Sequence, residues 1–193
     1  MKIAILAWGS LAWDPRELQF TGLWNPEGPE LFLEFLRISR DGRLTLVIDE
    51  EQGTPVRSGY YLSAFQNLDG AIANLRKREK VQSDDIGYVN FKTGRTRQSA
   101  LKRHPLAFEA IITWAREREL EGVVWTGLPA NFKEKQKTEF SPEAAVHYLN
   151  GLDAEKRAQA VEYIQRAPAQ IQTRFRQMFR TRPEGEIYLF VDG

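Results

Sequence analysis

The chain of 193 residues contains no cysteine. A disulfide framework and a thiolate metal site are therefore excluded, and nothing in the sequence ties the protein to an oxidising compartment. The chain also lacks any run of roughly 18 uncharged apolar residues, the length that a membrane helix requires. Its opening apolar run, residues 2–8, is too short for a signal peptide. We therefore expect a cytoplasmic protein that does not span a membrane.

An excess of charge of one sign is also missing. The chain has 27 basic and 26 acidic residues, a formal net charge of +1, so no overall field draws it to nucleic acid or anionic lipid. Its two histidines, His104 and His147, lie far apart in sequence and lack a carboxylate-rich ligand spacing. No phosphate-binding glycine motif follows a strand. We expect neither a metal ion nor another cofactor, and the sequence carries no pattern that sets an oligomeric state.

The composition is that of an ordinary globular protein, with 42% hydrophobic and 27% charged residues. No repeat or composition break divides the chain, so we predict one α+β domain over residues 1–193. The pattern predicts a central strand over residues 2–8 and an irregular connection over 12–30. Three strands of an antiparallel meander and one helix follow, over residues 31–39, 43–48, 55–63 and 65–80.

The second half of the chain alternates between helix and strand signals. We predict a strand over 86–91, a mobile loop over 92–104, a helix over 105–119 and a strand over 123–128. A helical carboxyl-terminal portion, about residues 141–182, follows. It contains helices capped by Ser141 and Asp153 and a third helix over 169–180, and a closing strand is predicted over 186–191.

Glu79 is the best candidate for a catalytic carboxylate. At about 100° per residue, it lies near the middle of the apolar stripe formed by Leu68, Ile72 and Leu75 on the helix over 65–80. A carboxylate that faces an apolar interior loses hydration, which raises its pKa and lets it exchange a proton near neutral pH. The spacing therefore favours an acid/base role.

The alternative is that Glu79 lies in the last turn of the helix and pairs with a neighbouring cation, namely Arg76, Arg78 or Lys80. Such ion pairs are common on protein surfaces and carry no function. Periodicity by itself leaves both interpretations open.

The turn formed by Trp8, Gly9, Ser10 and Leu11 is the second candidate. A strand that ends in glycine can expose successive backbone N–H groups to a carboxylate or a developing oxyanion. The alternative is an ordinary strand-ending turn. Ser10 is not assigned as a nucleophile, because the segment is not Gly-x-Ser-x-Gly and no paired histidine is evident.

Together the two segments resemble a known family. Leu6-Ala7-Trp8-Gly9-Ser10-Leu11 resembles the amino-terminal Tyr-Gly-Ser-Leu signature of gamma-glutamylcyclotransferase-like proteins. Arg78-Glu79-Lys80, which follows the predicted strands and helix, is similar to the glutamate segment of the ChaC-type branch of that family. The resemblance covers roughly the first half of the chain and, more loosely, the segment Val123-Val124-Trp125.

The resemblance implies a small, mixed β-barrel surrounded by helices, with a glycine-serine loop that binds the gamma-glutamyl part of a small substrate. It also implies a reaction without a cofactor, in which the substrate's α-amine attacks its own γ-carbonyl to give 5-oxoproline and a free amine, with Glu79 as general acid/base. Trp8 stands where the family usually has tyrosine, which removes a hydroxyl group and adds bulk beside the pocket. A member that retains the pocket for binding but not for catalysis is the alternative.

A different class of function is suggested by the carboxyl-terminal segment, which is rich in arginine and poor in acids. Its basic residues could bind nucleic acid or an acidic partner. Ile171, Phe175, Met178 and Phe179 nevertheless have the spacing of a helical core face, which favours an amphipathic helix with arginine on its exposed side. The arginines concerned are Arg166, Arg174, Arg176, Arg180 and Arg182.

Overall fold

The structure is a computed structural model that describes residues 1–190, and it confirms a mixed α+β protein. The strands are β1 (Ile3–Ala7), β2 (Phe20–Asn25), β3 (Glu30–Ile38), β4 (Leu44–Ile48), β5 (Thr54–Arg57), β6 (Gly59–Ser63), β7 (Ile86–Asn90), β8 (Gly122–Thr126), β9 (Phe179–Thr181) and β10 (Ile187–Leu189). The α-helices are α1 (Leu68–Glu79), α2 (Gln98–Arg103), α3 (Pro105–Glu117), α4 (Phe132–Gln136), α5 (Pro142–Asn150), α6 (Ala154–Arg166) and α7 (Arg174–Met178). Two short 3₁₀ turns are η1 (Ser10–Ala12) and η2 (Ser83–Asp85).

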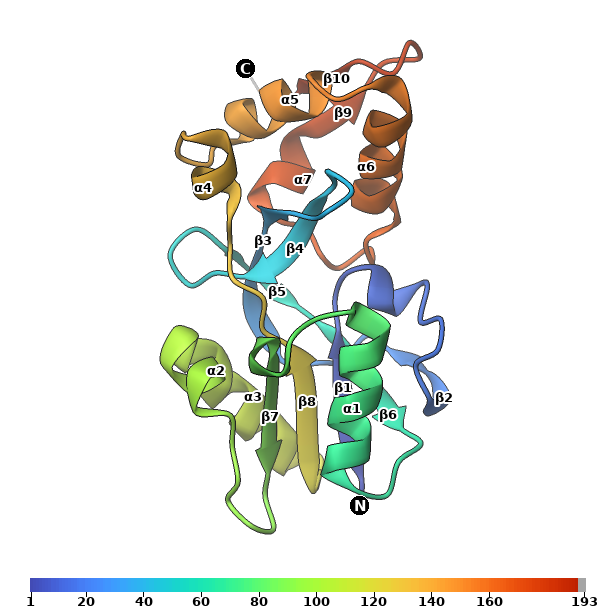
Figure 1. Ribbon diagram of the computed structural model, residues 1–193, viewed down its shortest axis with the longest axis vertical. Helices are drawn as coiled ribbons and strands as arrows, with labels where there is room; N and C mark the ends of the chain where they lie inside the picture. Colours follow the sequence, from blue (N-terminus) through green and yellow to red (C-terminus); the bar gives the residue numbers. More distant parts are fainter. Residues whose placement is uncertain (191–193) are drawn as a thin grey trace.

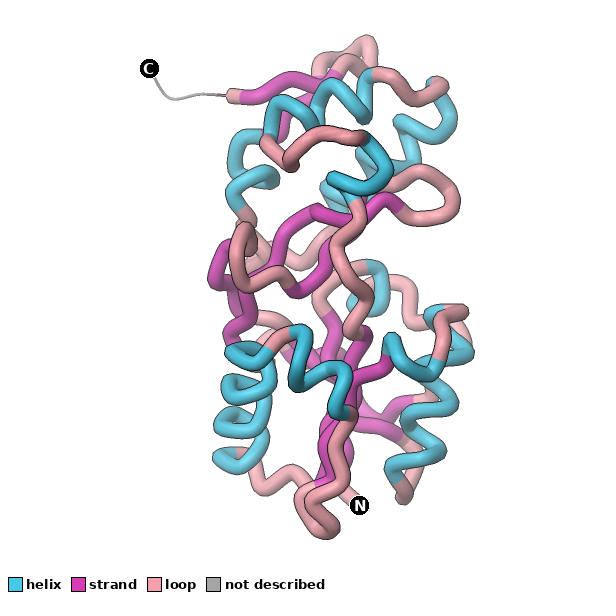
Figure 2. The backbone as a smooth tube through the Cα atoms, turned by 60° about the vertical axis from the view of Figure 1, so that its left-hand side comes forward, coloured by secondary structure: helices cyan, strands magenta, loops and turns pink. Residues whose placement is uncertain are grey.

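The largest sheet has five strands in the order β2-β6-β1-β8-β7, so β1 is central, as predicted. It pairs antiparallel with β6 and parallel with β8. Alternate residues of β1 enter separate apolar clusters: Ile3 and Ile5 pack with α1, whereas Ala4 and Leu6 belong to the cluster that contains α3. Figure 2 shows helices on both sides of this sheet. Both faces of β1 are therefore buried, which explains its continuous apolar sequence.

The predicted strand over 55–63 is two strands, and the predicted meander is wrong. β5 pairs with β3, whereas β6 crosses to the five-stranded sheet and pairs with β1. The break is at Ser58, which is fully buried and whose Oγ donates to the Pro29 carbonyl oxygen at 2.7 Å. β3 therefore lies at the centre of a separate sheet, with the order β4-β3-β5.

This division also corrects the barrel predicted from the family resemblance. The strands among residues 1–190 form open sheets of five, three and two strands, without closing a barrel. Gly28 lies directly against Ser58, where any Cβ would clash with the serine backbone, and the two residues hydrogen-bond through Gly28 N and Ser58 O at 2.9 Å. The chain thus passes between the two sheets twice at one place, once between β2 and β3 and once between β5 and β6.

The carboxyl-terminal portion forms the far end of an elongated molecule (Figure 1), with α4 to α7 and the β9-β10 pair. Ser141 and Asp153 cap α5 and α6 as predicted, since each side chain accepts a backbone hydrogen bond. The helix predicted over 169–180 is wrong in extent, because only α7 is helical. The preceding loop is held by Arg176, whose guanidinium donates to four backbone carbonyls including Pro168 and Ile171. The end of the predicted closing strand, Val191, lies outside the described residues.

Two predicted loops contain regular structure. The connection over 12–30 includes β2, an edge strand in which no residue is fully buried, so it carries no alternating apolar signal. The predicted mobile loop over 92–104 contains α2, in which only Ala100 is buried. Helix α4 was also not predicted. Each of these segments has too small an apolar face for its periodicity to be seen.

His104 provides a test of the packing between α2 and α3. It is buried, and its Nε2 has no hydrogen-bond partner among the described residues. Burial, with a smaller contribution from Arg103, lowers the pKa of the imidazole from 6.5 to about 4. Burial of the neutral imidazole is therefore compatible with the folded state only while His104 is unprotonated. Its contribution to the free energy of unfolding is complete above the unfolded-state pKa of about 6.5 and is lost as the pH falls to the folded-state pKa of about 4.

We expect the free energy of unfolding to fall more steeply between pH 6.5 and 4 in the wild type than in His104→Gln, by at most about 3 kcal/mol. Urea denaturation at several pH values measures this difference. His147→Gln is the control, because His147 lies exposed on α5 and should leave the wild-type profile unchanged. Parallel profiles for wild type and His104→Gln would contradict the expectation.

No helix among residues 1–190 combines the length and apolar character needed to cross a bilayer.

Candidate active site

A pocket of about 590 Å³ lies where the end of the five-stranded sheet, the β3-β4 hairpin and α6 meet. All of the site residues predicted from the sequence line it: Glu79 and the turn formed by Trp8, Gly9, Ser10 and Leu11. These two segments are about 70 positions apart in the chain. They meet because β1 and α1 run side by side and end at the same edge of the sheet (Figure 1).

Glu79 is the last residue of α1, and its side chain is 19% exposed. Burial raises the pKa of this carboxyl above its usual range, and the positive charges of Arg78 and Arg16 partly oppose that effect. Lys80 ends the helix with φ at +54°, a left-handed conformation in which glycine is more usual. This turn directs the following residues, Val81 and Gln82, along the rim of the pocket.

Arg78 connects the two halves of the predicted site. Its side chain is 4% exposed, and its Nη1 lies 2.8 Å from Glu79 Oε1. Its Nη2 donates to the Asp14 carbonyl oxygen and, at 3.4 Å, to Ser10 Oγ. The alternative in which Glu79 pairs with a neighbouring arginine is therefore correct about the ion pair. It is wrong in placing the pair on the open surface. Both residues line the pocket, and Arg78 also binds the amino-terminal turn through Ser10 and Asp14.

The turn after β1 continues into η1, whose carbonyls are used internally: Gly9 O accepts from Ala12 N at 2.9 Å, and Ser10 O accepts from Asp14 N at 2.8 Å. Trp8 is 6% exposed, and its indole N–H donates to the carbonyl oxygen of Leu46 at 3.4 Å. β4 is an edge strand of the three-stranded sheet, so the backbone of Leu46 is free to bind across the pocket. Trp8 thereby ties the amino-terminal turn to the β3-β4 hairpin.

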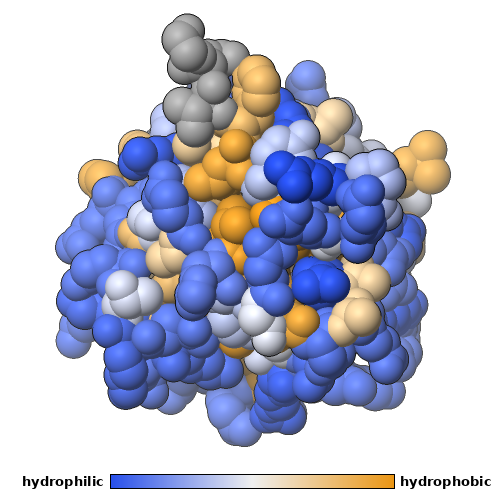
Figure 3. Space-filling model, turned by 90° about the horizontal axis from the view of Figure 1, so that it is seen from above, coloured by the Kyte–Doolittle hydropathy of each residue, from blue (hydrophilic) through white to orange (hydrophobic). Residues whose placement is uncertain are grey.

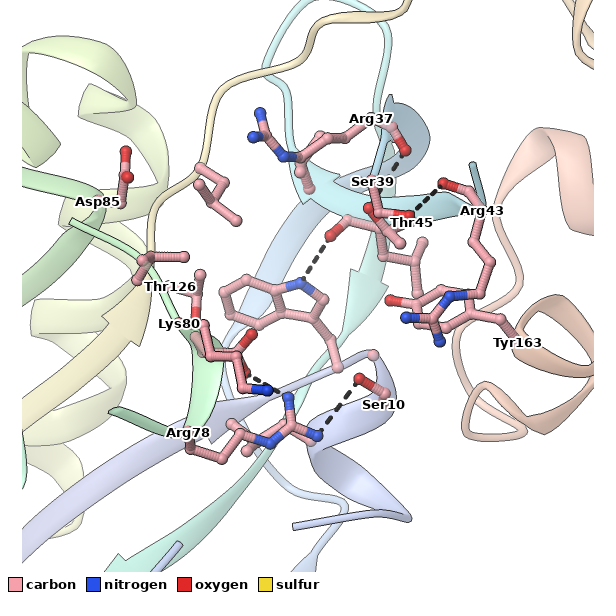
Figure 4. Close-up of a pocket in the computed structure, with 18 of the residues that line it drawn as sticks. Ser10, Arg37, Ser39, Arg43, Thr45, Arg78, Lys80, Asp85, Thr126 and Tyr163 are labelled. Carbon is pink, nitrogen blue, oxygen red and sulfur yellow. Dashed lines mark hydrogen bonds and ion pairs between the residues drawn. The ribbon is translucent and has the colours of Figure 1, made fainter. Parts of the chain in front are cut away.

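Tyr163 brings α6 into the site. Its hydroxyl lies so close to Gly9 that any Cβ at that position would clash with it. Burial raises the pKa of this hydroxyl to about 12, and the nearby backbone of Leu46 and Ser10 partly opposes that shift. Arg43 stacks on the phenol ring, with its guanidinium carbon 5.4 Å from the ring centroid. Figure 4 shows Arg43 and Tyr163 side by side at one edge of the pocket.

The pocket is strongly basic, although the whole chain has a net charge of only +1. Its lining includes three acidic residues, Asp41, Glu79 and Asp85, and twice as many basic ones. The basic residues are Arg16, Arg37, Arg40, Arg43, Arg78 and Lys80. An excess of three positive charges in one concave site favours an anionic ligand.

Arg37, Arg40 and Lys80 make no ion pair with any carboxylate among residues 1–190, whereas the other three basic side chains each have one. Arg37 projects from β3 and donates from Nη1 to the Pro129 carbonyl oxygen at 2.7 Å. Figure 4 shows it across the pocket from Arg78 and Ser10. Arg37 therefore places an unneutralised positive charge across the pocket from the ion pair of Arg78 and Glu79.

No group of three or more histidine, aspartate or glutamate side chains within the described part of the chain could hold a metal ion. The chemistry available at the pocket is that of one carboxylate of raised pKa, several guanidinium groups and hydrogen-bond donors on a glycine-serine turn.

No family model, curated protein or solved structure matches this chain. The resemblance to the gamma-glutamylcyclotransferase-like proteins, drawn from the short segments around Gly9 and Glu79, therefore stays a prediction.

The carboxyl-terminal arginines are largely engaged within the protein. Arg176 binds backbone carbonyls, Arg166 pairs with Glu162 at 2.9 Å, and Arg182 pairs with Glu186 at 2.8 Å. Phe175 and Phe179 are buried in the core. Seen end-on (Figure 3), this end of the molecule shows an apolar strip between hydrophilic side chains. These contacts favour a structural role for the segment over a nucleic-acid surface.

Sequence reasoning missed Arg78, Tyr163 and Arg37 as parts of the site. Arg78 follows Leu75 by three positions and was detectable, because it continues the buried face of α1, which consists of Leu68, Ala71, Asn74, Leu75 and Arg78. Tyr163 shares the buried face of α6 with Ala160 and Ile164, but no local pattern shows that this face meets Gly9. Arg37 lies on a strand with buried neighbours and gives no signal of its own.

Proposed function

We propose that this protein cyclises gamma-glutamyl compounds to 5-oxoproline and releases the attached amine. The observation that carries the proposal is the convergence of Glu79 and the turn Trp8–Leu11 on one pocket. The likeness of these two segments to the gamma-glutamylcyclotransferase-like proteins supports the same reaction. Neither segment points to this chemistry without the other.

The pocket suits such a substrate in size and charge. Its volume of about 590 Å³ lies within the ordinary range for small-molecule sites, roughly 300–1,000 Å³. A gamma-glutamyl amino acid carries one ammonium and two carboxylate groups, and so has a net negative charge. Arg37, Arg40 and Lys80, which have no carboxylate partner among residues 1–190, can bind the two carboxylates while Glu79 faces the ammonium.

In the proposed reaction, the Glu79 carboxylate takes a proton from the α-ammonium group of the substrate. The free amine then attacks the γ-carbonyl carbon, a carbon–nitrogen bond forms, and the carbonyl electron pair moves to oxygen. When the carbonyl re-forms, the bond to the departing nitrogen breaks. Both protons lost by the attacking nitrogen end on the departing nitrogen, with Glu79 as the carrier, so protons and charge balance.

The environment of Glu79 fits both halves of this cycle. Burial raises its pKa, which favours the acid form that the second transfer requires. Arg78 favours the ionised form, which is the one that the first transfer requires. Holding the substrate's amine and γ-carbonyl in a cyclic geometry further accelerates the intramolecular attack.

We expect the wild-type protein to release 5-oxoproline from at least one compound in a panel of gamma-glutamyl-alanine, gamma-glutamyl-glutamate, glutathione and gamma-glutamyl-ethylamide. Because the pocket is basic, kcat/KM should be at least about tenfold higher for leaving amines that carry a carboxylate than for the neutral ethylamine. A tenfold ratio corresponds to about 1.4 kcal/mol, less than a typical charged hydrogen bond contributes. Mass spectrometry of 5-oxoproline measures the reaction.

The α-linked dipeptide of glutamate and alanine is the control substrate, because its peptide carbonyl cannot be reached by its own amine in a five-membered ring. Failure of every gamma-glutamyl compound to react above the uncatalysed rate would end the enzymatic proposal. If calorimetry then showed tight binding of the same compounds, the protein would be a binding member of the fold. The ion pair between Glu79 and Arg78 is the observation that favours this second outcome.

A further inference from the structure

We infer that the hydroxyl of Tyr163 donates a hydrogen bond to the γ-carbonyl oxygen of the substrate and stabilises the oxyanion that forms on it. This inference rests on the proposed cyclisation. It assigns a catalytic role to a residue of α6, an element outside the two segments that resemble the family.

The unused hydrogen of the Tyr163 hydroxyl supports this role. Two other tyrosine hydroxyls donate to backbone carbonyls, Tyr61 to Ala12 and Tyr148 to Gly42. Tyr163 donates to no acceptor among residues 1–190 and lines the pocket, which leaves its own hydrogen for a ligand.

The phenol is also held rigidly, as an oxyanion donor must be. Its ring packs edge-on against Trp13 and Phe35, with centroids 5.3 and 6.3 Å away, and Arg43 stacks on its face. Gly9 allows the hydroxyl to approach the turn closely, since no side chain intervenes. A donor fixed in advance needs no rearrangement when charge develops on the substrate.

The Tyr163 hydroxyl acts as a hydrogen-bond donor and takes no part in the proton transfers. With a pKa of about 12, the phenol keeps its proton at neutral pH and serves as a donor, while Glu79 carries the transferred protons. No bond to the tyrosine forms or breaks during the reaction.

The test is Tyr163→Phe, which keeps the ring and its packing and removes only the hydroxyl. We expect kcat for 5-oxoproline release to fall by roughly 10²- to 10³-fold, the effect of removing one oxyanion donor, with KM changed by only a few-fold. Tyr60→Phe is the matched control, because Tyr60 packs on Trp114 and does not line the pocket. It should react at the wild-type rate.

A sulfur-substituted substrate separates this role from a structural one. A γ-thioamide accepts hydrogen bonds weakly, so the wild type should strongly prefer the oxygen substrate, and Tyr163→Phe should lose most of that preference. Turnover by Tyr163→Phe at the wild-type kcat, or an unchanged oxygen-to-sulfur ratio, would overturn the inference and leave the proposed cyclisation intact. A wild-type protein that makes no 5-oxoproline would overturn both.

Discussion

Glu79→Gln is expected to lower kcat for 5-oxoproline release by about 10²- to 10⁴-fold, the usual contribution of a positioned acid/base group. Glutamine nearly matches glutamate in size, so it fills the same space at the end of α1 and can still accept a hydrogen bond from Arg78. It cannot take the ammonium proton. KM should therefore change little, and steady-state kinetics on the best substrate of the panel separates the two parameters.

Glu117→Gln is the control for this experiment. Glu117 is also the last residue of its helix, α3, and also lies beside an adjacent arginine, with Glu117 Oε2 and Arg118 Nη1 3.6 Å apart. Its side chain is 67% exposed and lies outside the pocket. It should keep wild-type activity. Equal turnover by Glu79→Gln and the wild type would remove Glu79 from the mechanism.

The parts of the fold that were predicted correctly are those whose signal is local. The apolar run of β1, the stripe of α1 and the caps of α5 and α6 each depend on residues within one turn or one strand. The break at Ser58 has no such signal, because it is set by Gly28 and Pro29, which lie about 30 positions earlier in the chain. The barrel prediction failed at this break.

The candidate site follows the same rule. Glu79 and Gly9 were found because each lies in a segment with a recognisable pattern, and the order of those segments resembles a family. Their meeting in one pocket depends on the pairing of β1 with its neighbours and on the packing of α1 against the sheet. Tyr163 is about 150 positions from Gly9, so only the tertiary structure shows their contact.

Arg78 has two roles that a substitution can separate. As a nearly buried cation, it anchors the turn of Ser10 and Asp14 to the end of α1. As the partner of Glu79, it lowers the pKa of a carboxyl that burial would otherwise raise further. The first role contributes to stability and the second to the pH range in which Glu79 is ionised, so the two have different measurements.

Arg78→Met is expected to lower the free energy of unfolding by about 3 kcal/mol, because the polar groups that the guanidinium satisfied lose their partner. It should also raise the pKa of Glu79, since burial is then opposed only by the more distant Arg16. The carboxylate form is present above that pKa, so the acid limb of the kcat/KM profile should move to higher pH.

Arg78→Lys keeps the charge and should leave the acid limb close to its wild-type position. Urea denaturation reports the stability of both variants. If Arg78→Met lost stability but kept the wild-type pH profile, Arg78 would be an anchor of the turn only, and Glu79 would not be the group whose ionisation controls the reaction.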